Sequence, residues 1–515
     1  MSQLLVRSLL LVSTPALLAT GFLALSASLH AREATDDPHA TLTKAEALED
    51  LEIFAKRLGE EGAYLALRES RPFESVEELR RRLPDSISAS EFARELRKIL
   101  SPIGDCHSSI TCAADDDEPG LWLPFRLASA CGGIIAVNRD YSSFVAPDHP
   151  YLVEVDGWPL QDWLDAALKY APVGSGSQNL YAALKGIRRI DILRRDLGIA
   201  ESTEVALVFA NAEGERRQMT LPCRNRFSSL AEIRLGVSRR IGESGESGES
   251  GEIGEIGYLR LPAMDDDLVP GAKRLMDEFR DTEGLVIDLR GNGGGRYGLL
   301  RALFGYFQPP EDGPFVCNVA AFRLAPRFRS DHIEYRPTHR RDWPGWSEED
   351  GAAIDAIMAG FEPGFPLPRE QFSDWHFMVL KRENSHWHYD RPVIVLCDER
   401  CVSASDGFLA AFSLLPQVTL MGVGSRGASG SSRSVRLPRS GIDFKLSTMV
   451  SFRPDGRPFE GIGVAVDVPA QPCPEDFIAD RDSVLEQALE SLRPPLTTRG
   501  LRREGSRGNK KDRDK

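Results

Sequence analysis

The sequence predicts an α/β protein whose parallel sheet carries the functional residues at its carboxyl edge. Two junctions are the basis of this prediction. An apolar strand at residues 285–289 ends in a glycine-rich turn, and an apolar strand at residues 392–397 ends in a polar turn that leads into a helix. Such alternation is typical of parallel strands with crossover helices. A helical segment and a β-rich unit precede this region, so the 515 residues are expected to form several domains.

The first 31 residues are expected to form a secretory signal peptide. Arg7 precedes an apolar run at residues 9–27, and small residues follow, with cleavage expected after Ser28 or Ala31. The apolar run is long for a signal, so an uncleaved membrane anchor is the alternative. The protein is therefore expected in the periplasm or outside the cell, and membrane-associated only if this segment is retained.

Residues 32–115 are expected to form an N-terminal helical segment that carries His107. Apolar side chains recur there at helical spacing, as in Leu48, Leu51, Phe54 and Leu58. A further amphipathic helix is expected to run from Ser90 to Leu100 and to lead into a turn at residues 104–108. That turn places His107 directly after a helix.

Residues 116–225 are expected to form a β-rich unit. The run P-Y-L-V-E-V-D-G-W-P-L at residues 150–160 resembles the V-x-x-V-D-G-x-P-L strand and turn of PDZ domains, and residues 203–209 are typical of a later strand. PDZ domains bind peptide ends by adding a strand to a sheet edge. The G-L-G-F-type loop that binds the peptide carboxylate is not evident, so a purely structural role for this PDZ-like unit is the alternative.

Two segments lack the apolar residues that a core requires. Residues 226–256 contain glycine at every third position of a Gly-Glu-Ser repeat without proline, which excludes collagen and predicts a flexible acidic linker. Residues 493–515 predict a basic disordered tail, because eight basic and three acidic residues follow from Arg499 onward. The formal net charge of −14 argues against nucleic-acid binding.

The glycine-rich turn follows the strand at residues 285–289. Its glycines allow positive φ and a close approach of the backbone to whatever lies at the strand end. A dinucleotide site would need G-x-G-x-x-G with a later acidic residue, and a P-loop would need G-K-[ST]. Neither pattern is present in residues 291–295.

The second junction places Ser403 between a strand and a helix. A hydroxyl there lies at the carboxyl end of the strand, and the helix N-terminus directs free N–H groups at any anion formed nearby. Nucleophilic serines use this geometry in several unrelated folds. Taken alone, the junction favours helix capping by Ser403, Ser405 and Asp406, and the nearby glycine turn is what favours catalysis.

Together the two junctions resemble those of the tail-specific (C-terminal processing) and tricorn-core serine peptidases. That family carries a D-L-R-x-N-x-G-G turn and, later, S-A-S-[ED] at a helix start, which match residues 288–295 and 403–406. Further matches are residues 257–261, 454–464, Asp467 and the closing helix at 482–492. The resemblance covers residues 257–492 and implies a clp-protease/crotonase-like catalytic core that hydrolyses peptide bonds.

The resemblance also shows a departure. The tail-specific branch has a lysine base twenty-five residues after the serine, where this chain has Ala428. Arg426 is the only cation in that loop, and a guanidinium does not deprotonate in proteins. The tricorn-like branch uses a histidine from the N-terminal segment and a later glutamate instead. The resemblance therefore implies His107 and Glu460 in these roles.

These residue types would complete a catalytic triad. A histidine near neutral pH removes the proton of the Ser403 hydroxyl, and a carboxylate holds its tautomer. An oxyanion hole needs two N–H donors, for which the N–H groups of Ala404 and Gly294 are expected. Gly294 is favoured over Gly293 because relatives often have proline at the latter position. Assistance of His107 by Cys106 or Ser108 stays open.

All eight cysteines follow the signal segment, which in an exported protein predicts disulfides. The pairs Cys106–Cys112 and Cys397–Cys401 are the expected ones, although the sequence does not determine connectivity. The scattered cysteines contain no C-x₂-C pair, so no metal site and no cofactor are expected.

The sequence thus predicts an exported serine endopeptidase with Ser403 as nucleophile and His107 as base, acting on a peptide or protein substrate. The alternative is a catalytically inactive peptide- or lipophile-binding protein on the same fold. The missing lysine favours the alternative, whereas the retained Ser403, His107, Glu460 and glycine turn favour the enzyme.

Overall fold

A computed structural model describes residues 41–113, 115, 120–225, 251–253, 256–325, 336–383 and 387–493. The expected signal peptide, most of the expected linker and nearly all of the expected tail lie outside these residues. No helix within the described ranges is long and apolar enough to cross a membrane.

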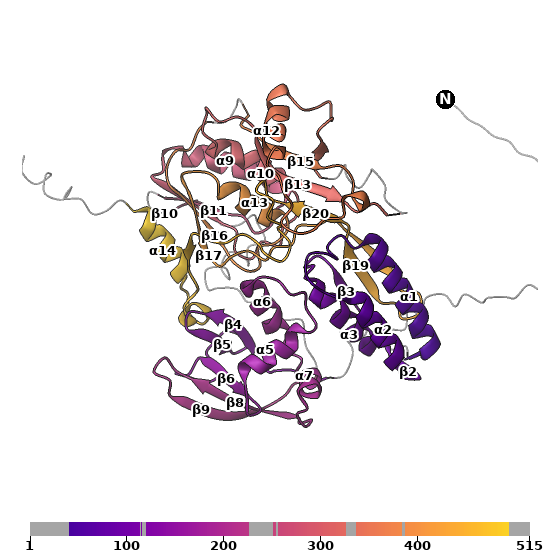
Figure 1. The fold of residues 1–515 in the computed structure, drawn as a ribbon. Coiled ribbons are helices and arrows are strands. Elements are labelled where there is room, and N and C mark those ends of the chain that lie inside the picture. Colours follow the sequence, from indigo (N-terminus) through magenta and orange to yellow (C-terminus); the bar gives the residue numbers. More distant parts are fainter. Residues whose placement is uncertain are drawn as a thin grey trace, which may run out of the picture.

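A six-stranded sheet forms the centre of the catalytic region, in the order β10-β11-β12-β16-β17-β21 (Figure 1). Its strands are β10 (Gly251–Ile253), β11 (Ile256–Arg260), β12 (Gly284–Asp288), β16 (Val393–Cys397), β17 (Val418–Gly422) and β21 (Val468–Pro469). All neighbours are parallel except the antiparallel pair β10 and β11. The carboxyl ends of β12 and β16 therefore lie at one edge, and the functional turns of both follow there.

Helices cover both faces of this sheet, which explains its continuous apolar strands. One face packs against α9 (Val269–Glu278), α10 (Gly298–Phe307) and α13 (Ala404–Phe412). The other face packs against α14 (Ser483–Leu492). Within β12 the period of two is visible, because Leu285 and Ile287 belong to the first core and Val286 belongs to the second.

A second, antiparallel sheet adjoins the catalytic core in the order β14-β15-β13-β20. Its elements are β13 (Phe315–Phe322), β14 (His339–Arg340), β15 (His376–Leu380), β20 (Met449–Phe452) and the covering helix α12 (Glu348–Met358). Trp375 packs edge-to-face on both Phe361 and Phe452. The tryptophans of this region thus contribute to a core of their own.

Three N-terminal helices pack on a hairpin of the catalytic region. They are α1 (Lys44–Glu61), α2 (Pro72–Arg82) and α3 (Ala89–Leu100), with β1 (Thr41–Thr43) paired to β2 (Ser86–Ser88). Their core includes Phe54 and Phe92 together with Phe444 of the hairpin formed by β18 (Ser432–Arg436) and β19 (Asp443–Ser447). Strand β3 (Ser109–Thr111) joins β19 and so fixes the turn that carries His107.

Residues 120–225, here called the β-unit, form a separate sheet with its own core around Trp163. Its elements are β4 (Arg126–Ala130), β5 (Gly133–Val137), β6 (Tyr151–Val155), β7 (Trp158–Pro159), β8 (Glu204–Ala210), β9 (Arg216–Pro222), α5 (Leu160–Leu168), α6 (Gly176–Gly186) and α7 (Ile190–Leu197). Asp156 and Gly157 both have positive φ, as a two-residue type I′ hairpin requires. Strand β4 is an edge strand.

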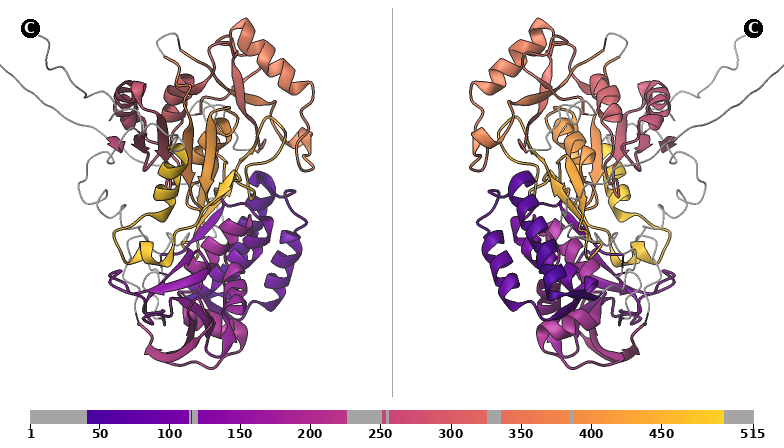
Figure 2. Two further views of the ribbon diagram at one scale, coloured as in Figure 1. Left: turned by 90° about the vertical axis from the view of Figure 1, so that its left-hand side faces the viewer. Right: turned by 90° about the vertical axis from the view of Figure 1, so that its right-hand side faces the viewer.

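Short 3₁₀ turns connect several of these elements. They are η1 (Ser101–Ile103), η2 (Asp266–Leu268), η3 (Phe279–Asp281), η4 (Arg369–Gln371) and η5 (Pro474–Phe477). The helical segment and the β-unit lie at one end of the molecule, and α12 with its sheet lies at the other (Figure 2).

Candidate active site

Ser403 lies in the turn between β16 and α13, as the sequence predicts. Its backbone has φ 65° and ψ −117°, a conformation that residues other than glycine rarely adopt. Its N–H donates to Asp406 Oδ2 at 2.7 Å. A strained turn that presents serine at a helix N-terminus is typical of serine nucleophiles.

The glycine turn touches this serine directly. Gly294 has φ +87°, and a Cβ added to it would lie 2.4 Å from the carbonyl oxygen of Val402 and 2.7 Å from Ser403 Cβ. Only glycine fits there. The buried Asn292 joins the two turns, because its Oδ1 accepts from Gly294 N at 2.9 Å and from Ser405 Oγ at 2.7 Å.

The expected oxyanion donors differ in their availability. Ala404 is the first residue of α13, so its N–H has no acceptor within the helix. The Gly294 N–H, by contrast, is already engaged by Asn292. The N–H of the exposed Gly293 donates to no acceptor in the described part of the chain. This geometry favours Gly293 over Gly294 as the second donor.

The turn of His107 is anchored by a buried carboxylate that sequence reasoning did not single out. Asp105 Oδ1 accepts from the N–H of His107 at 3.0 Å, from the N–H of Ser108 at 3.2 Å and from Ser447 Oγ at 2.7 Å. Ser447 belongs to β19, the strand that pairs with β3. Asp105 therefore fixes the backbone on both sides of His107.

Glu460 is fully buried and lies against the same turn, but not on the imidazole. Its Oε1 accepts from the N–H of Cys106 at 2.6 Å, and its Oε2 accepts from the N–H of Ser429 at 3.0 Å. The structure contains no hydrogen bond between the His107 ring and Glu460 or Ser403, all of which it describes. Nδ1 of His107 is buried without a partner among the described residues. Glu460 thus holds the turn rather than the ring.

One loop connects the nucleophile to the histidine turn. At residues 425–428, where relatives carry their lysine, Ser425 Oγ and the N–H groups of Gly427 and Ala428 all donate to Asp406. The next residue, Ser429, donates to Glu460. Ser403 and the turn of His107 are therefore held by the two ends of a five-residue loop, although they lie far apart in sequence.

The charges around the site keep His107 neutral. Burial and the positive charges of Arg336, Lys445 and Arg426 lower the pKa of His107 to about 3. Burial also raises the pKa of Asp406 to about 6 and raises that of Glu460 well above its ordinary value. The imidazole is therefore neutral at pH 7, as a general base must be, and a pKa this low also makes it a weak base.

A buried ion network supports the glycine turn from behind. Arg290 binds Asp288 and Asp482 through its guanidinium, with the NH2 group 2.7 Å from each carboxylate. Asp288 also accepts from Arg260 Nη1 and the Tyr258 hydroxyl, both at 2.9 Å. Asp482 begins α14 as its N-cap. The D-L-R motif therefore connects the turn to the closing helix.

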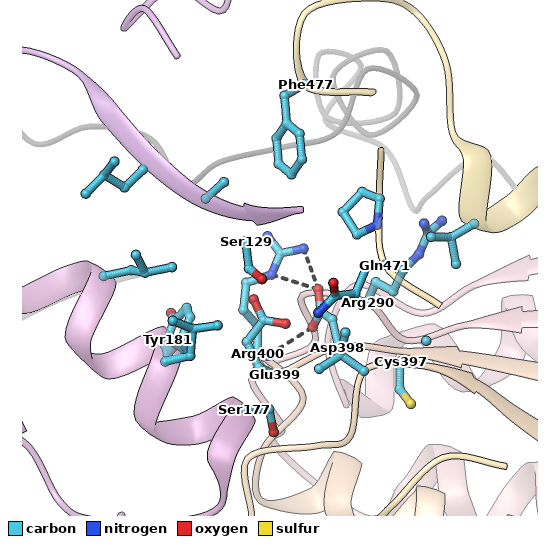
Figure 3. A pocket seen from close by; sticks show the side chains of 18 of the residues that line it. Ser129, Ser177, Tyr181, Arg290, Cys397, Asp398, Glu399, Arg400, Gln471 and Phe477 are labelled. Atoms are coloured by element: carbon cyan, nitrogen blue, oxygen red, sulfur yellow. Dashed lines mark hydrogen bonds and ion pairs between the residues drawn. The ribbon is translucent and has the colours of Figure 1, made fainter. Parts of the chain in front are cut away.

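A cavity of about 570 Å³ lies beside these turns, between the β-unit and the catalytic core. Strand β4 and helix α6 form one wall, and residues 397–400, 422–423 and 470–472 form the other. Ser129, Tyr181, Glu399 and Gln471 surround this space in the close-up view (Figure 3). Ser403 and His107 are not among its lining residues.

The cysteines do not form the expected disulfides, since all eight are free. The reason is visible for both expected pairs. Cys397 Sγ donates to Met421 O and Cys401 Sγ donates to Leu289 O, at 3.8 and 3.1 Å, so each thiol has its own acceptor. Cys112 is buried in the helical core, whereas Cys106 lies against Gly174. In the described ranges no group of three or more His, Cys, Asp or Glu side chains is arranged to hold a metal ion.

The family model described as peptidase family S41 matches residues 255–470. No curated protein matches the sequence.

Several solved structures are similar to this one. Mature CPAF has a TM-score of 0.63 at 19% identity, over 87% of this chain and 98% of that chain. Mature CPAF complexed with lactacystin has a TM-score of 0.61 at the same identity and coverage. The photosystem II D1 C-terminal processing protease has a TM-score of 0.39 at 13% identity, over 84% and 94%. The two CPAF structures share the fold of this chain along most of its length.

Proposed function

We propose that this chain, whose residues 255–470 match the model of peptidase family S41, is a serine endopeptidase that works through an acyl-enzyme on Ser403. In this proposal His107 takes the serine proton as the hydroxyl attacks the scissile carbonyl. The protonated imidazole then donates this proton to the leaving amine. Water then attacks the acyl-enzyme in the same way, with His107 as base, and releases the acid product.

The observation that carries this proposal is the strained, positive-φ turn of Ser403 at the start of α13. Such a turn is costly and has no evident use in packing. It presents the serine beside the Ala404 N–H and against the glycine turn, where donors for a developing oxyanion are needed. In this proposal the second donor is the N–H of Gly293, or that of Gly294 after Asn292 releases it.

Glu460 has a positioning role in this mechanism. Its carboxylate holds the N–H of Cys106, which precedes the base, and so fixes where the imidazole can lie. The unpartnered, buried Nδ1 of His107 leaves the ring free to rotate toward Ser403 when substrate arrives. Catalytic hydrogen bonds are often absent before substrate binds.

The second candidate function is a binding protein without catalysis. It is favoured by the absence of a hydrogen bond from the imidazole to Ser403 and by the cavity of about 570 Å³ against β4. Strand β4 is an unpaired edge, to which a PDZ-like unit would add a peptide strand. In that case Ser403, which does not line this cavity, would be unreactive.

A fluorophosphonate probe distinguishes the two functions, because only an activated serine reacts. Wild type should be labelled, Ser403→Ala and His107→Ala should not, and Ser413→Ala is the matched control, since Ser413 is an exposed serine at the end of the same helix. Turnover of a quenched peptide should fall on the order of 10⁴-fold in both inactive variants. Labelled Ser403→Ala, or an inert wild type that binds peptide, would favour the alternative. Lactacystin, bound in a solved complex of mature CPAF, is a candidate competitor of the probe.

We further propose export through residues 1–31, to the periplasm or the medium. Fractionation combined with N-terminal sequencing tests this: a mature chain that starts after Ser28 or Ala31 supports a cleaved signal. An intact N-terminus in the membrane fraction would instead support the anchor.

A further inference from the structure

Cys131 and Cys473 lie side by side where the β-unit meets the catalytic region. Cys131 follows the last residue of β4, and its N–H donates to the carbonyl oxygen of Pro472 at 2.9 Å. The thiol of Cys131 lies within hydrogen-bonding reach of the thiol of Cys473. Two cysteines that are remote in sequence are thus adjacent in both backbone and side chain.

Both backbones are fixed in this arrangement. Tyr151 Oη donates to the carbonyl oxygen of Cys131 at 3.1 Å, and the N–H of Cys473 donates to Asp476 Oδ2 at 2.9 Å. Phe477, four residues after Cys473, packs into a buried cluster with residues of β4 and β5. A covalent link here would therefore need little rearrangement, which is the usual obstacle to forming a disulfide.

The two thiols are also accessible. Cys131 is exposed and Cys473 is partly exposed, whereas four of the eight cysteines are buried. Both border a surface cleft that Tyr151 and Glu475 also line. A small disulfide reagent can therefore reach Cys131 first.

We propose that Cys131 and Cys473 form a reversible disulfide that staples the β-unit to the catalytic region. The oxidant is a small-molecule disulfide such as oxidised glutathione. The Cys131 thiolate attacks it to give a mixed disulfide and one glutathione thiolate. The Cys473 thiolate then attacks Cys131 Sγ, so that the protein S–S bond forms, the mixed disulfide breaks and a second glutathione thiolate leaves. Two protein thiols are oxidised, and the oxidant is reduced to two glutathione thiols, which take up the two protons that the protein thiols release.

The staple would act on the cavity beside the active site. Residues 127–129 of β4 belong to one of its walls, and residues 470–472 belong to the other (Figure 3). Cys473 directly follows the second of these segments in the chain, and Cys131 lies two residues after the first. In the oxidised protein the disulfide therefore fixes the distance between the two walls at one end of the cavity. In the reduced protein only noncovalent contacts determine that distance.

The exchange should be slow at neutral pH. Partial removal of the Cys131 thiol from water, its hydrogen bond with the thiol of Cys473 and the nearby acidic side chains of Glu475 and Asp476 raise the pKa of the Cys131 thiol above its ordinary value. Because the thiolate is the attacking species, oxidation is best tested at about pH 9.

The experiment uses the purified full chain, oxidised with glutathione disulfide, denatured, alkylated and mapped by mass spectrometry. We expect a peptide pair linked through Cys131 and Cys473, with six of the eight cysteines alkylated, and a higher Tm than for the reduced chain. Dithiothreitol should reverse both changes. Cys223→Ser, a partly exposed cysteine of the same β-unit, is the matched control and should behave as wild type.

The outcome decides the proposal in each case. Cys131→Ser with Cys473→Ser should show no Tm difference between oxidised and reduced protein. Eight alkylated cysteines after oxidation, glutathione retained on Cys131 alone, or a link from Cys131 to another cysteine would each overturn it. None of these readouts depends on peptidase activity, so the result stands whether or not Ser403 is catalytic.

Discussion

At Ser403 the backbone adopts a strained conformation. A non-glycine residue at φ 65° costs about 1–3 kcal/mol, and such strain persists only where the surroundings impose it. Here Asp406 holds the N–H of the serine, and Asn292 holds the turn that faces it. The strain is therefore built into the junction rather than into the side chain.

This conclusion predicts different stabilities for two variants of Ser403. Ser403→Gly should raise the free energy of unfolding by about 1 kcal/mol, because glycine adopts positive φ without steric cost. Ser403→Ala keeps the Cβ, so its stability should stay close to that of wild type. Urea denaturation measures both. A glycine variant less stable than the alanine variant would show that the turn is unstrained.

The histidine leads to a second prediction, on pH. Burial, together with Arg336, Lys445 and Arg426, lowers the pKa of His107 to about 3, so the acid limb of kcat/KM should lie well below the ordinary value of about 6.5. The same shift affects stability: the unfolded chain binds a proton below about pH 6.5 and the folded chain does not. The contribution of His107 is thus present above that pH and lost as the pH falls toward 3.

The His107→Gln variant isolates this contribution. Its unfolding free energy should fall less steeply between about pH 6.5 and 3 than that of wild type, as measured by urea titrations at several pH values. Parallel pH profiles for both proteins, or an acid limb at 6.5 in the wild-type enzyme, would show that the imidazole is hydrated.

At the scale of elements, the loop at residues 425–429 has a structural role: it supplies hydrogen-bond donors and no base. Where relatives place a lysine base, this loop directs its donors at two buried carboxylates, Asp406 and Glu460. Ala428, the residue at the lysine position, is completely buried. A lysine there would have to displace the packing that holds the serine and histidine turns together.

Asp406 should therefore matter for stability as much as for catalysis. Each of its oxygens accepts two bonds, so the amide of Asp406→Asn must face two donors in either orientation. We expect a loss of about 3 kcal/mol in unfolding free energy. Asp443→Asn, on an exposed carboxylate, is the control and should cost below about 1 kcal/mol. Equal losses in the two variants would contradict the role given to Asp406.

Sequence patterns predict the local part of this site and miss the nonlocal part. The apolar strands, the glycine turn and the start of α13 are set by neighbours in the chain, and the structure places all of them as predicted. The hydrogen bond of Glu460 to Cys106 rather than to the imidazole spans 354 residues. Whether the N–H of Gly294 is occupied depends, in turn, on the side-chain rotamer of Asn292. No periodicity or motif encodes such contacts, although a buried asparagine within a glycine turn is a usable signal.

At the scale of the whole molecule, Arg290 connects the catalytic turn to the C-terminal helix. It is buried with Asp288 and Asp482, whose side chains are 2% and 3% exposed. Although burial raises the pKa of Asp288, the guanidinium groups of Arg260 and Arg290 lower it below its usual range. Asp288 is therefore a charged partner whose burial depends on the two arginines.

Arg290→Ala should lower the free energy of unfolding by about 3–5 kcal/mol, because it removes a guanidinium that contacts two buried carboxylates. Arg341→Ala, which breaks a pair with Asp355 at the surface, should cost less than about 1 kcal/mol. Chemical denaturation compares them. Similar midpoints for the two variants would mean that the network is hydrated.

The domain order along the chain is readable from composition, whereas its assembly in space is not. Helical periodicity, the D-G hairpin and the glycine repeat separate the segments. The pairing of β3 with β19, which carries His107 to the catalytic core, depends on strands of three and five residues. Strands this short have too little pattern to be assigned from sequence. The proximity of Cys131 to Cys473 is likewise a tertiary contact that no sequence pattern indicates.

The pairing of β3 with β19 also determines at which stage of synthesis the site can assemble. Ribosomes deliver the histidine turn early, the nucleophile some three hundred residues later, and the β19 partner and Glu460 later still. Under the proposed mechanism a growing chain holds every earlier part in an unassembled, inert form until its last hundred residues emerge. A prematurely terminated chain that ends before β19 would therefore contain Ser403 without the strand that holds the turn of His107 in place.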